Sequence, residues 1–84
     1  MTRYTVVWVQ EAQDELGYVW LRASDHQAVT DAAQVVAREL AEDATVKGID
    51  LHEGLRAFFA PPLRVMYAVN EQDRLVEVLR VMRI

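Results

Sequence analysis

The strongest constraint on the fold lies toward the carboxyl end of the sequence, where apolar residues occupy every second position. They alternate with other residues over Leu63–Val69, and a second alternating run covers Arg74–Ile84. A period of two is typical of a β-strand, because successive side chains point to opposite faces of a sheet. The polar residues 70–73 between the runs have the length and chemistry of a hairpin turn. The sequence therefore predicts a β-hairpin that places Arg64 on the face opposite Tyr67.

The strand before this hairpin and the last strand each divide their side chains between two faces. The segment Leu55–Ala60 is short and aromatic, and Pro61-Pro62 ends it because proline cannot donate to a strand ladder. Neighbouring residues of a strand face opposite ways, so Phe58 and Phe59 place one ring on each face, and one ring is available to a partner. In the last strand the predicted faces are Val76, Val78, Arg80, Met82 and Ile84 on one side and Leu75, Glu77, Leu79, Val81 and Arg83 on the other.

Two helices are predicted earlier in the chain. Apolar residues recur at helical spacing near 10–22 and near 25–42, with charged residues on the other side. Ser24 begins a capping box, in which its hydroxyl accepts from the backbone N–H of Gln27. The two segments therefore form a helical hairpin.

The remaining segments complete the predicted order β-α-α-β-β-β. Thr2–Val9 is rich in β-branched and aromatic residues and is predicted to be the first strand. Glu42–Gly54 is polar and is expected to be irregular. Trp8 and Trp20 both lie on apolar stripes, so we expect them to be core anchors.

Length and composition exclude several classes of protein. The 84 residues (9.6 kDa) allow one domain, 1–84, because so short a chain cannot bury two cores. The absence of cysteine and the presence of only two histidines exclude thiolate and all-histidine metal sites. We therefore expect no metal and no cofactor. No apolar run approaches the ~20 residues of a membrane helix, and the start lacks the features of a signal peptide. We expect a cytoplasmic domain with no membrane partner.

The charge is distributed unevenly along the chain. The net charge of −4 combines residues 1–53, with four basic and ten acidic side chains, and residues 54–84, with five basic and three acidic ones. The five basic residues of the second part are all arginines: Arg56, Arg64, Arg74, Arg80 and Arg83. Arginine can grip phosphate or carboxylate bidentately. For any one of them, a general role in solubility is the alternative.

This order of elements resembles the RelE/ParE superfamily, the toxins of type II toxin–antitoxin pairs. Leu63–Val69 is similar to the family's Tyr-Arg-Val-Leu-Tyr-x-Val strand. Val76–Val81 is similar to the family's final strand, and Tyr4–Trp8 resembles its opening strand. The resemblance implies an α+β fold in which a four-stranded antiparallel sheet carries the helical hairpin on one face and the activity on the other.

The resemblance implies three alternative functions. The first is that of a RelE-like, ribosome-dependent mRNA endoribonuclease without a metal, which needs a base, an acid and a stabiliser of negative charge. The second is that of a ParE-like DNA gyrase inhibitor without hydrolytic activity, and the third is that of a non-toxic binding module. We expect the first function, because the arginines favour it, with the second and third as alternatives. The net charge of −4 and the missing lysines of the middle strand favour the others.

Candidate site residues follow from the same resemblance. Arg64 matches the family's strand arginine, which contacts phosphate in the RNA-cleaving branch. Arg56 matches a basic strand position when one gap is allowed, and Arg83 lies near the end of the last strand, where the family carries a basic residue or histidine. No residue is a clear general base. The nearest titratable groups are His52 and Glu53, for which a plain loop role is the alternative.

The implied partners are a cognate antitoxin and either the ribosome with mRNA or DNA gyrase. The positive second part of the chain would attract an antitoxin segment rich in acidic and apolar residues. Either a homodimer or a toxin–antitoxin hetero-oligomer is compatible with this interpretation.

Overall fold

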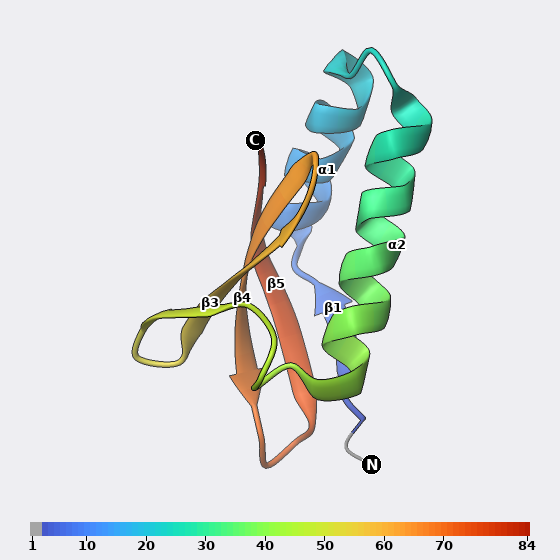
Figure 1. The fold of residues 1–84 in the computed structure, drawn as a ribbon. Coiled ribbons are helices and arrows are strands. Elements are labelled where there is room, and N and C mark those ends of the chain that lie inside the picture. Colours follow the sequence, from blue (N-terminus) through green and yellow to red (C-terminus); the bar gives the residue numbers. More distant parts are fainter. Residues whose placement is uncertain (1–2) are drawn as a thin grey trace.

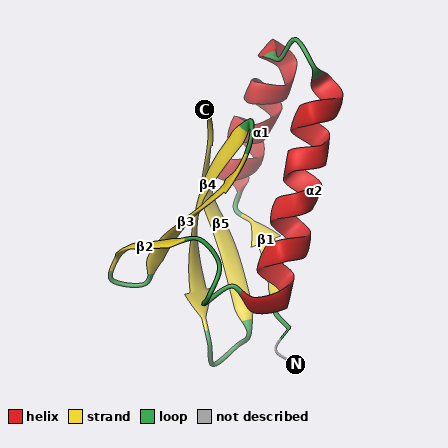
Figure 2. Ribbon diagram, in the orientation of Figure 1, coloured by secondary structure: helices red, strands yellow, loops and turns green. Residues whose placement is uncertain are grey.

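The computed structural model describes residues 3–84 as two helices packed on one face of a five-stranded sheet (Figure 1). The elements are β1 (Thr5–Trp8), α1 (Gln10–Arg22), α2 (His26–Asp43), β2 (Ile49–His52), β3 (Leu55–Ala60), β4 (Leu63–Asn70) and β5 (Leu75–Arg83). Both helices lie on the same side of the sheet (Figure 2). The predicted α+β class and the helical hairpin on one face are confirmed. Thr2, which the predicted first strand includes, lies outside the described residues.

The sheet has the strand order β1-β5-β4-β3-β2, so the first and last strands are neighbours. The predicted antiparallel arrangement holds for β3, β4 and β5, but β1 runs parallel to β5. A short turn forces an antiparallel pair, whereas the long connection between β1 and β5 leaves their direction free. The sheet is therefore mixed, and the expectation of an entirely antiparallel sheet is wrong at this edge.

A fifth strand, β2, lies in the segment that was expected to be irregular, so the expected count of four strands is also wrong. β2 pairs with β3 across a turn at Glu53 and Gly54, whose φ angles of 44° and 84° are both positive. Such a turn matches the twist of a hairpin, and glycine adopts it without strain. All four residues of β2 are exposed, so no buried face marks the strand in the sequence.

The helices lie within one residue of their predicted bounds, but the cap between them differs. Asp25, not Ser24, is the N-cap of α2, and its carboxylate accepts from the backbone N–H of Ala28 at 3.0 Å. Aspartate satisfies an open N–H of the first turn as well as serine does. The predicted bond between Ser24 and Gln27 is therefore replaced by the same kind of bond one residue later.

The core lies between the helices and the sheet face that they cover. The largest fully buried side chains are Tyr67, Leu40, Leu63, Val29, Val36, Val65, Val76 and Val78. Trp8 packs against this core, as expected. Trp20 is 38% exposed, so the prediction that it anchors the core is wrong.

Candidate functional site

The open face, which is the sheet face without helices, follows from the alternation that builds the core. β4 turns Leu63, Val65 and Tyr67 into the core and turns Arg64 and Met66 outward, as predicted. Cross-strand pairing then defines the open face by three rows: Phe59–Arg64–Met82, Ala57–Met66–Arg80 and Leu55–Ala68–Glu77.

Arg64 lies at the centre of the first row. Its guanidinium carbon is 5.7 Å from the centroid of the Phe59 ring, within the range of cation–π attraction. Its Nε is buried and has no hydrogen-bond partner among the described residues. A buried donor without a partner costs free energy. The guanidinium of Arg64 is also a fork of donors of the kind that binds carboxylate or phosphate bidentately.

The last strand changes face at a β-bulge. Tyr67 pairs with Val78 whereas Met66 pairs with Arg80, so one residue, Leu79, is extra on β5. An extra residue shifts every later side chain to the other face. Val81 is consequently buried on the core side, and the predicted grouping of the faces is wrong beyond Val78.

The bulge brings Arg80 to the open face, where its charge is already compensated. Nε and Nη2 of Arg80 lie 2.8 and 2.7 Å from Oε2 of Glu15 on α1. The other carboxylate oxygen of Glu15 accepts from the backbone N–H of Val81 at 2.7 Å. The hydrogen bond from Arg80 above all holds the pKa of Glu15 below its usual value. Arg80 thus ties α1 to the sheet.

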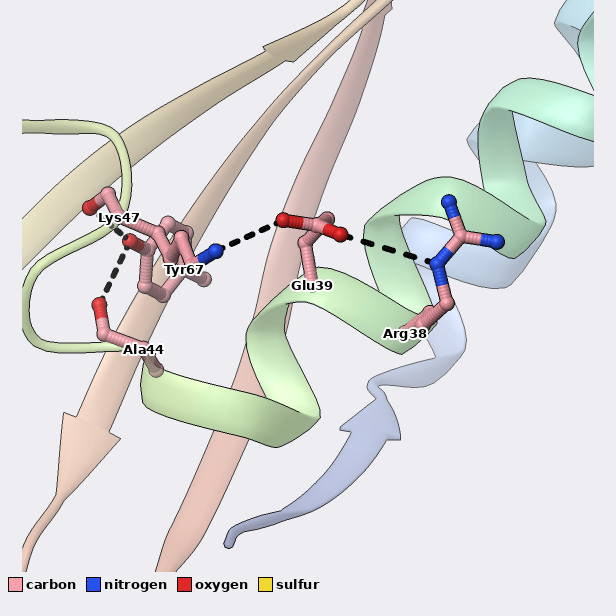
Figure 3. A network of polar contacts seen from close by, with 5 residues as sticks. All are labelled: Arg38, Glu39, Ala44, Lys47 and Tyr67. Carbon is pink, nitrogen blue, oxygen red and sulfur yellow. Dashed lines mark hydrogen bonds and ion pairs between the residues drawn. The ribbon is translucent and has the colours of Figure 1, made fainter. Parts of the chain in front are cut away.

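Arg56 of β3 lies on the helix side of the sheet and is paired with Tyr67 of the neighbouring strand β4. Its Nε and Nη2 donate to the carbonyl oxygen of Lys47 at 3.1 and 2.9 Å, and Nε also lies 3.3 Å from the Tyr67 hydroxyl. That hydroxyl is 2.7 Å from the carbonyl oxygen of Lys47 and 2.9 Å from that of Ala44 (Figure 3). Burial raises the pKa of Tyr67, which keeps the hydroxyl protonated as a donor. We call these four residues the Tyr67 cluster, and they hold the loop between α2 and β2 against the sheet.

Two further features brace the same loop. Nζ of Lys47 lies 2.7 Å from Oε1 of Glu39, and Glu39 is also paired with Arg38 at 3.7 Å (Figure 3). Gly48 has a φ of +69°, and a Cβ at this position would overlap the carbonyl oxygen of Ala57. Only glycine fits so close to a neighbouring strand.

The proposed acid–base pair lies at the tip of the β2–β3 hairpin. The side chains of His52 and Glu53 are 75% and 81% exposed, with 3.5 Å between Nε2 and Oε2. Leu55, at the base of this tip, is four residues from Phe59, which is about 13 Å along a strand. A general base acts within about 3 Å of the proton that it removes. The tip therefore lies too far along β3 to share a reacting atom with Arg64 in this conformation.

Arg83 lies on the face of the sheet opposite to Arg64. It is paired with Leu63 at the end of β5 and lines a cavity of about 620 Å³ together with residues of the turn between the helices. The structure therefore brings none of the other candidates into the row of Arg64. Sequence reasoning underrated Phe59. The adjacent residues Phe58 and Phe59 predicted one exposed ring, but the sequence did not show which of the two it is.

Residues 3–84 contain no candidate metal site and no candidate membrane-spanning helix. No group of three or more His, Asp or Glu side chains in this range could hold a metal ion. No helix in the same range is long and apolar enough to cross a membrane.

The architecture defines a class: small α+β proteins in which a helical hairpin covers one face of a sheet and leaves the other open. No protein-family model matches the sequence, and no curated protein matches it. Among solved structures, a chain of the RelBE2 toxin–antitoxin complex from Mycobacterium tuberculosis superposes with a TM-score of 0.83 at 18% identity, covering 100% of this chain and 94% of that one.

A chain of the chromosomal ParDE toxin–antitoxin system from P. aeruginosa gives a TM-score of 0.70 at 16% identity, covering 98% of this chain and 97% of that one. This protein therefore has the RelE/ParE-like fold.

Proposed function

We propose that this protein is the toxin of a type II toxin–antitoxin pair and that it binds a protein target through its open face, as a ParE-like inhibitor of DNA gyrase in the cytoplasm. The observation that carries the proposal is the composition of the open face. Phe59 is 46% exposed there, beside the half-buried Met66 and Met82, and Arg64 provides one arginine with an unpartnered donor.

This composition is typical of a surface that binds protein. Aromatic residues, methionine and arginine are enriched at protein interfaces, and a few such side chains contribute most of the binding energy. Surfaces that bind nucleic acid are much more positively charged. Of the two arginines in the rows of the open face, Arg80 is paired with Glu15. A mainly apolar face, on which Arg64 is the arginine without an ion pair among the described residues, therefore favours the gyrase inhibitor over the nuclease.

A cognate antitoxin is part of the same proposal. The two structural neighbours come from toxin–antitoxin complexes, which supports such a partner. The open face would accept an antitoxin segment that is apolar opposite Phe59 and carries a carboxylate opposite Arg64. Copurification from the native operon should yield the companion chain. Recovery of only the free protein would count heavily against the pair.

Two assays and a pair of matched variants test the protein target. Induced expression should stop growth, and the purified protein should inhibit supercoiling by gyrase while a reporter mRNA stays intact in primer extension. Phe59→Asp should relieve both growth arrest and gyrase inhibition, whereas Tyr18→Asp, at an aromatic side chain 57% exposed on α1, should relieve neither. Cleaved mRNA with normal supercoiling would overturn the proposal.

The unpartnered Nε of Arg64 favours a second candidate function, RelE-like cleavage of mRNA on the ribosome. In that reaction the guanidinium stabilises charge on the phosphate as the 2′-oxygen attacks. Arg64→Ala should then lower the cleavage rate by about 10²–10³, while Arg64→Lys should recover little. The melting temperature should stay within a few degrees of the parent. Full toxicity of Arg64→Ala would remove Arg64 from the site.

A further inference from the structure

A second group of exposed apolar side chains lies at β2, at the other end of the sheet from β1. Val46 precedes this strand and is 70% exposed, and Ile49 and Leu51 within it are 56% and 41% exposed. Single exposed apolar residues are ordinary on a monomer, whereas a cluster of them marks an interaction surface. The segment 46–51 is such a cluster.

The backbone of β2 is open along one side. β2 pairs with β3 and is the last strand of the sheet in the described part of the chain. Figure 2 shows the β2–β3 hairpin projecting away from both helices. An uncovered edge presents N–H and C=O groups that can pair with a strand of another chain. In such pairing the main chain supplies affinity, and the side chains select the partner.

The bulge in β2 leaves its central leucine free for such a contact. Asp50 pairs with Arg56 and His52 pairs with Leu55, so Leu51 lies between two paired residues without a partner of its own on β3. The extra residue of a bulge is left out of the ladder. Leu51 can therefore lie at the centre of a contact with another chain.

The residues around Leu51 are complementary to a second copy of themselves. Two identical strands pair in antiparallel fashion across a two-fold axis, so each contact occurs twice. With the axis at Leu51, the two leucines face each other, and Asp50 of each copy faces His52 of the other. Opposite charges at directly opposed positions stabilise a strand pair. A protonated histidine therefore completes two ion pairs in one dimer.

Neighbouring registers lack this complementarity. An axis at Asp50 would place two aspartates directly opposite each other, and like charges at such positions are destabilising. An axis between Asp50 and Leu51 would place each aspartate opposite a leucine. The side chains thus favour one register, the one centred on Leu51.

The charged groups around this contact favour the protonated histidine. His52 is 75% exposed, and its Nε2 lies 3.5 Å from Oε2 of Glu53. The dimer would add Asp50 of the second copy on its other side. Arg56, the strand partner of Asp50, donates to the carbonyl oxygen of Lys47 within its own chain. The contact should therefore strengthen as pH falls through about 6.5, where histidine ordinarily gains its charge.

We infer that β2 pairs with β2 of a second copy of this chain, in the antiparallel register centred on Leu51, and so joins the two sheets into one. The two-fold axis of such a pair is perpendicular to the sheet, so both open faces lie on one side and both helical hairpins on the other. The inference goes beyond the proposed function, which concerns the open face and a different protein. β2 has four residues and a bulge, features that limit pairing at an edge. We expect a dissociation constant of about 0.1–1 mM.

Sedimentation equilibrium of the full chain from about 10 µM to about 1 mM tests the dimer, because this range brackets the expected constant. The dimer should be more populated near pH 6 than near pH 8. His52→Gln should abolish this dependence on pH. His26→Gln is the control, because this histidine is stacked on Trp20 at the start of α2 and should leave the dependence unchanged.

Two charge-swapped variants test the register. Asp50→Lys places a cation opposite His52, and His52→Glu places an anion opposite Asp50, so each variant alone should stay monomeric. A mixture of the two should form a heterodimer at least as tight as that of the parent. In that heterodimer the new lysine faces the new glutamate, and one parent pair of Asp50 and His52 remains.

A matched pair of variants locates the contact. Leu51→Lys and Leu21→Lys each replace an exposed leucine by a cation, but Leu21 lies on α1. Leu51→Lys should weaken the dimer at least about tenfold, and Leu21→Lys less than about threefold. Three outcomes would overturn the inference: a monomer at about 1 mM, no association in the mixture of charge-swapped variants, or a dimer that Leu21→Lys dissociates and Leu51→Lys does not.

Discussion

The two faces of strand β4 use their polar groups in opposite ways. On the helix side, the Tyr67 hydroxyl lies within hydrogen-bond distance of three groups of its own chain. On the open side, the Nε of Arg64, three residues earlier, is buried without a partner in the described part of the chain. The helix side satisfies its polar groups internally and so stabilises the fold. The open side leaves one buried donor unsatisfied, which costs stability.

The largest effect should come from Gly48, which lies in the loop held by the Tyr67 cluster. Gly48→Ala should lower the free energy of unfolding by about 3–5 kcal/mol, because the new Cβ would overlap the carbonyl oxygen of Ala57 at a left-handed φ. Gly54→Ala is the control, since its φ is also positive but its Cβ has open space. It should cost about 1 kcal/mol. Equal losses in urea unfolding would show that the close approach does not matter.

A smaller effect should distinguish the two strand arginines. Arg56→Met should cost about 2 kcal/mol, because it removes the donors that hold the Lys47 carbonyl and the Tyr67 hydroxyl. Arg64→Met should not lower the free energy of unfolding and should raise it by about 1 kcal/mol, because it removes a buried donor that has no partner. Chemical denaturation of both variants measures the difference. A costlier loss at Arg64 would reverse the comparison between the faces.

Removing only the hydroxyl of Tyr67 should have a still smaller effect. Tyr67→Phe keeps the buried ring and should cost about 1 kcal/mol, because Arg56 still donates to the Lys47 carbonyl. Tyr18→Phe, at an exposed position, should be neutral. The double variant Tyr67→Phe/Arg56→Met should lose less free energy of unfolding than the sum of the two single losses, because both substitutions disrupt one cluster. Strict additivity would show that the two groups act separately.

The smallest effect should be a dependence of stability on pH at Glu15. Its folded-state pKa is lowered by the Arg80 hydrogen bond, so the contact stabilises the fold above the unfolded-state pKa of about 4.3 and is lost as pH falls through the folded value. Glu15→Gln should therefore destabilise the protein at pH 7 and bring it closer to the parent in acid. Thermal unfolding between neutral and acidic pH measures this. Glu77→Gln on the open face is the control and should show no such convergence.

Local sequence patterns predicted those helices and strands in which the periodicity of apolar residues matches one buried side. The alternation of Leu63–Val69 and the helical stripes each bury one side, so burial and periodicity agree. β2 depends on its pairing with β3 and buries nothing of its own, and the bulge at Leu79 appears only when β5 is aligned with β4. Neither feature has a local sequence pattern.

The candidate site was predicted in part for the same reason. The face of Arg64 follows from its own strand. The face of Arg56 depends on the turn at Pro61-Pro62, where Ala60 pairs directly with Leu63. That register pairs even-numbered residues of one strand with odd-numbered residues of the other. Arg56 and Arg64 are both even, so they lie on opposite faces of the sheet, which no pattern within either strand could reveal.

The adjacency of β1 and β5 determines when the fold can be completed during synthesis. Thr5 pairs with Leu75 and Trp8 with Val78, so the first strand made has no partner in the sheet until the last one emerges. Closing so long a loop makes this pairing slow and non-local, unlike the hairpins between β2 and β5. β1 must therefore remain without this partner until the elements that separate it from β5 have all been synthesised. A chain that ends before β5 would lose the partner of β1 and the partner of β4 at once, because β5 lies between these two strands.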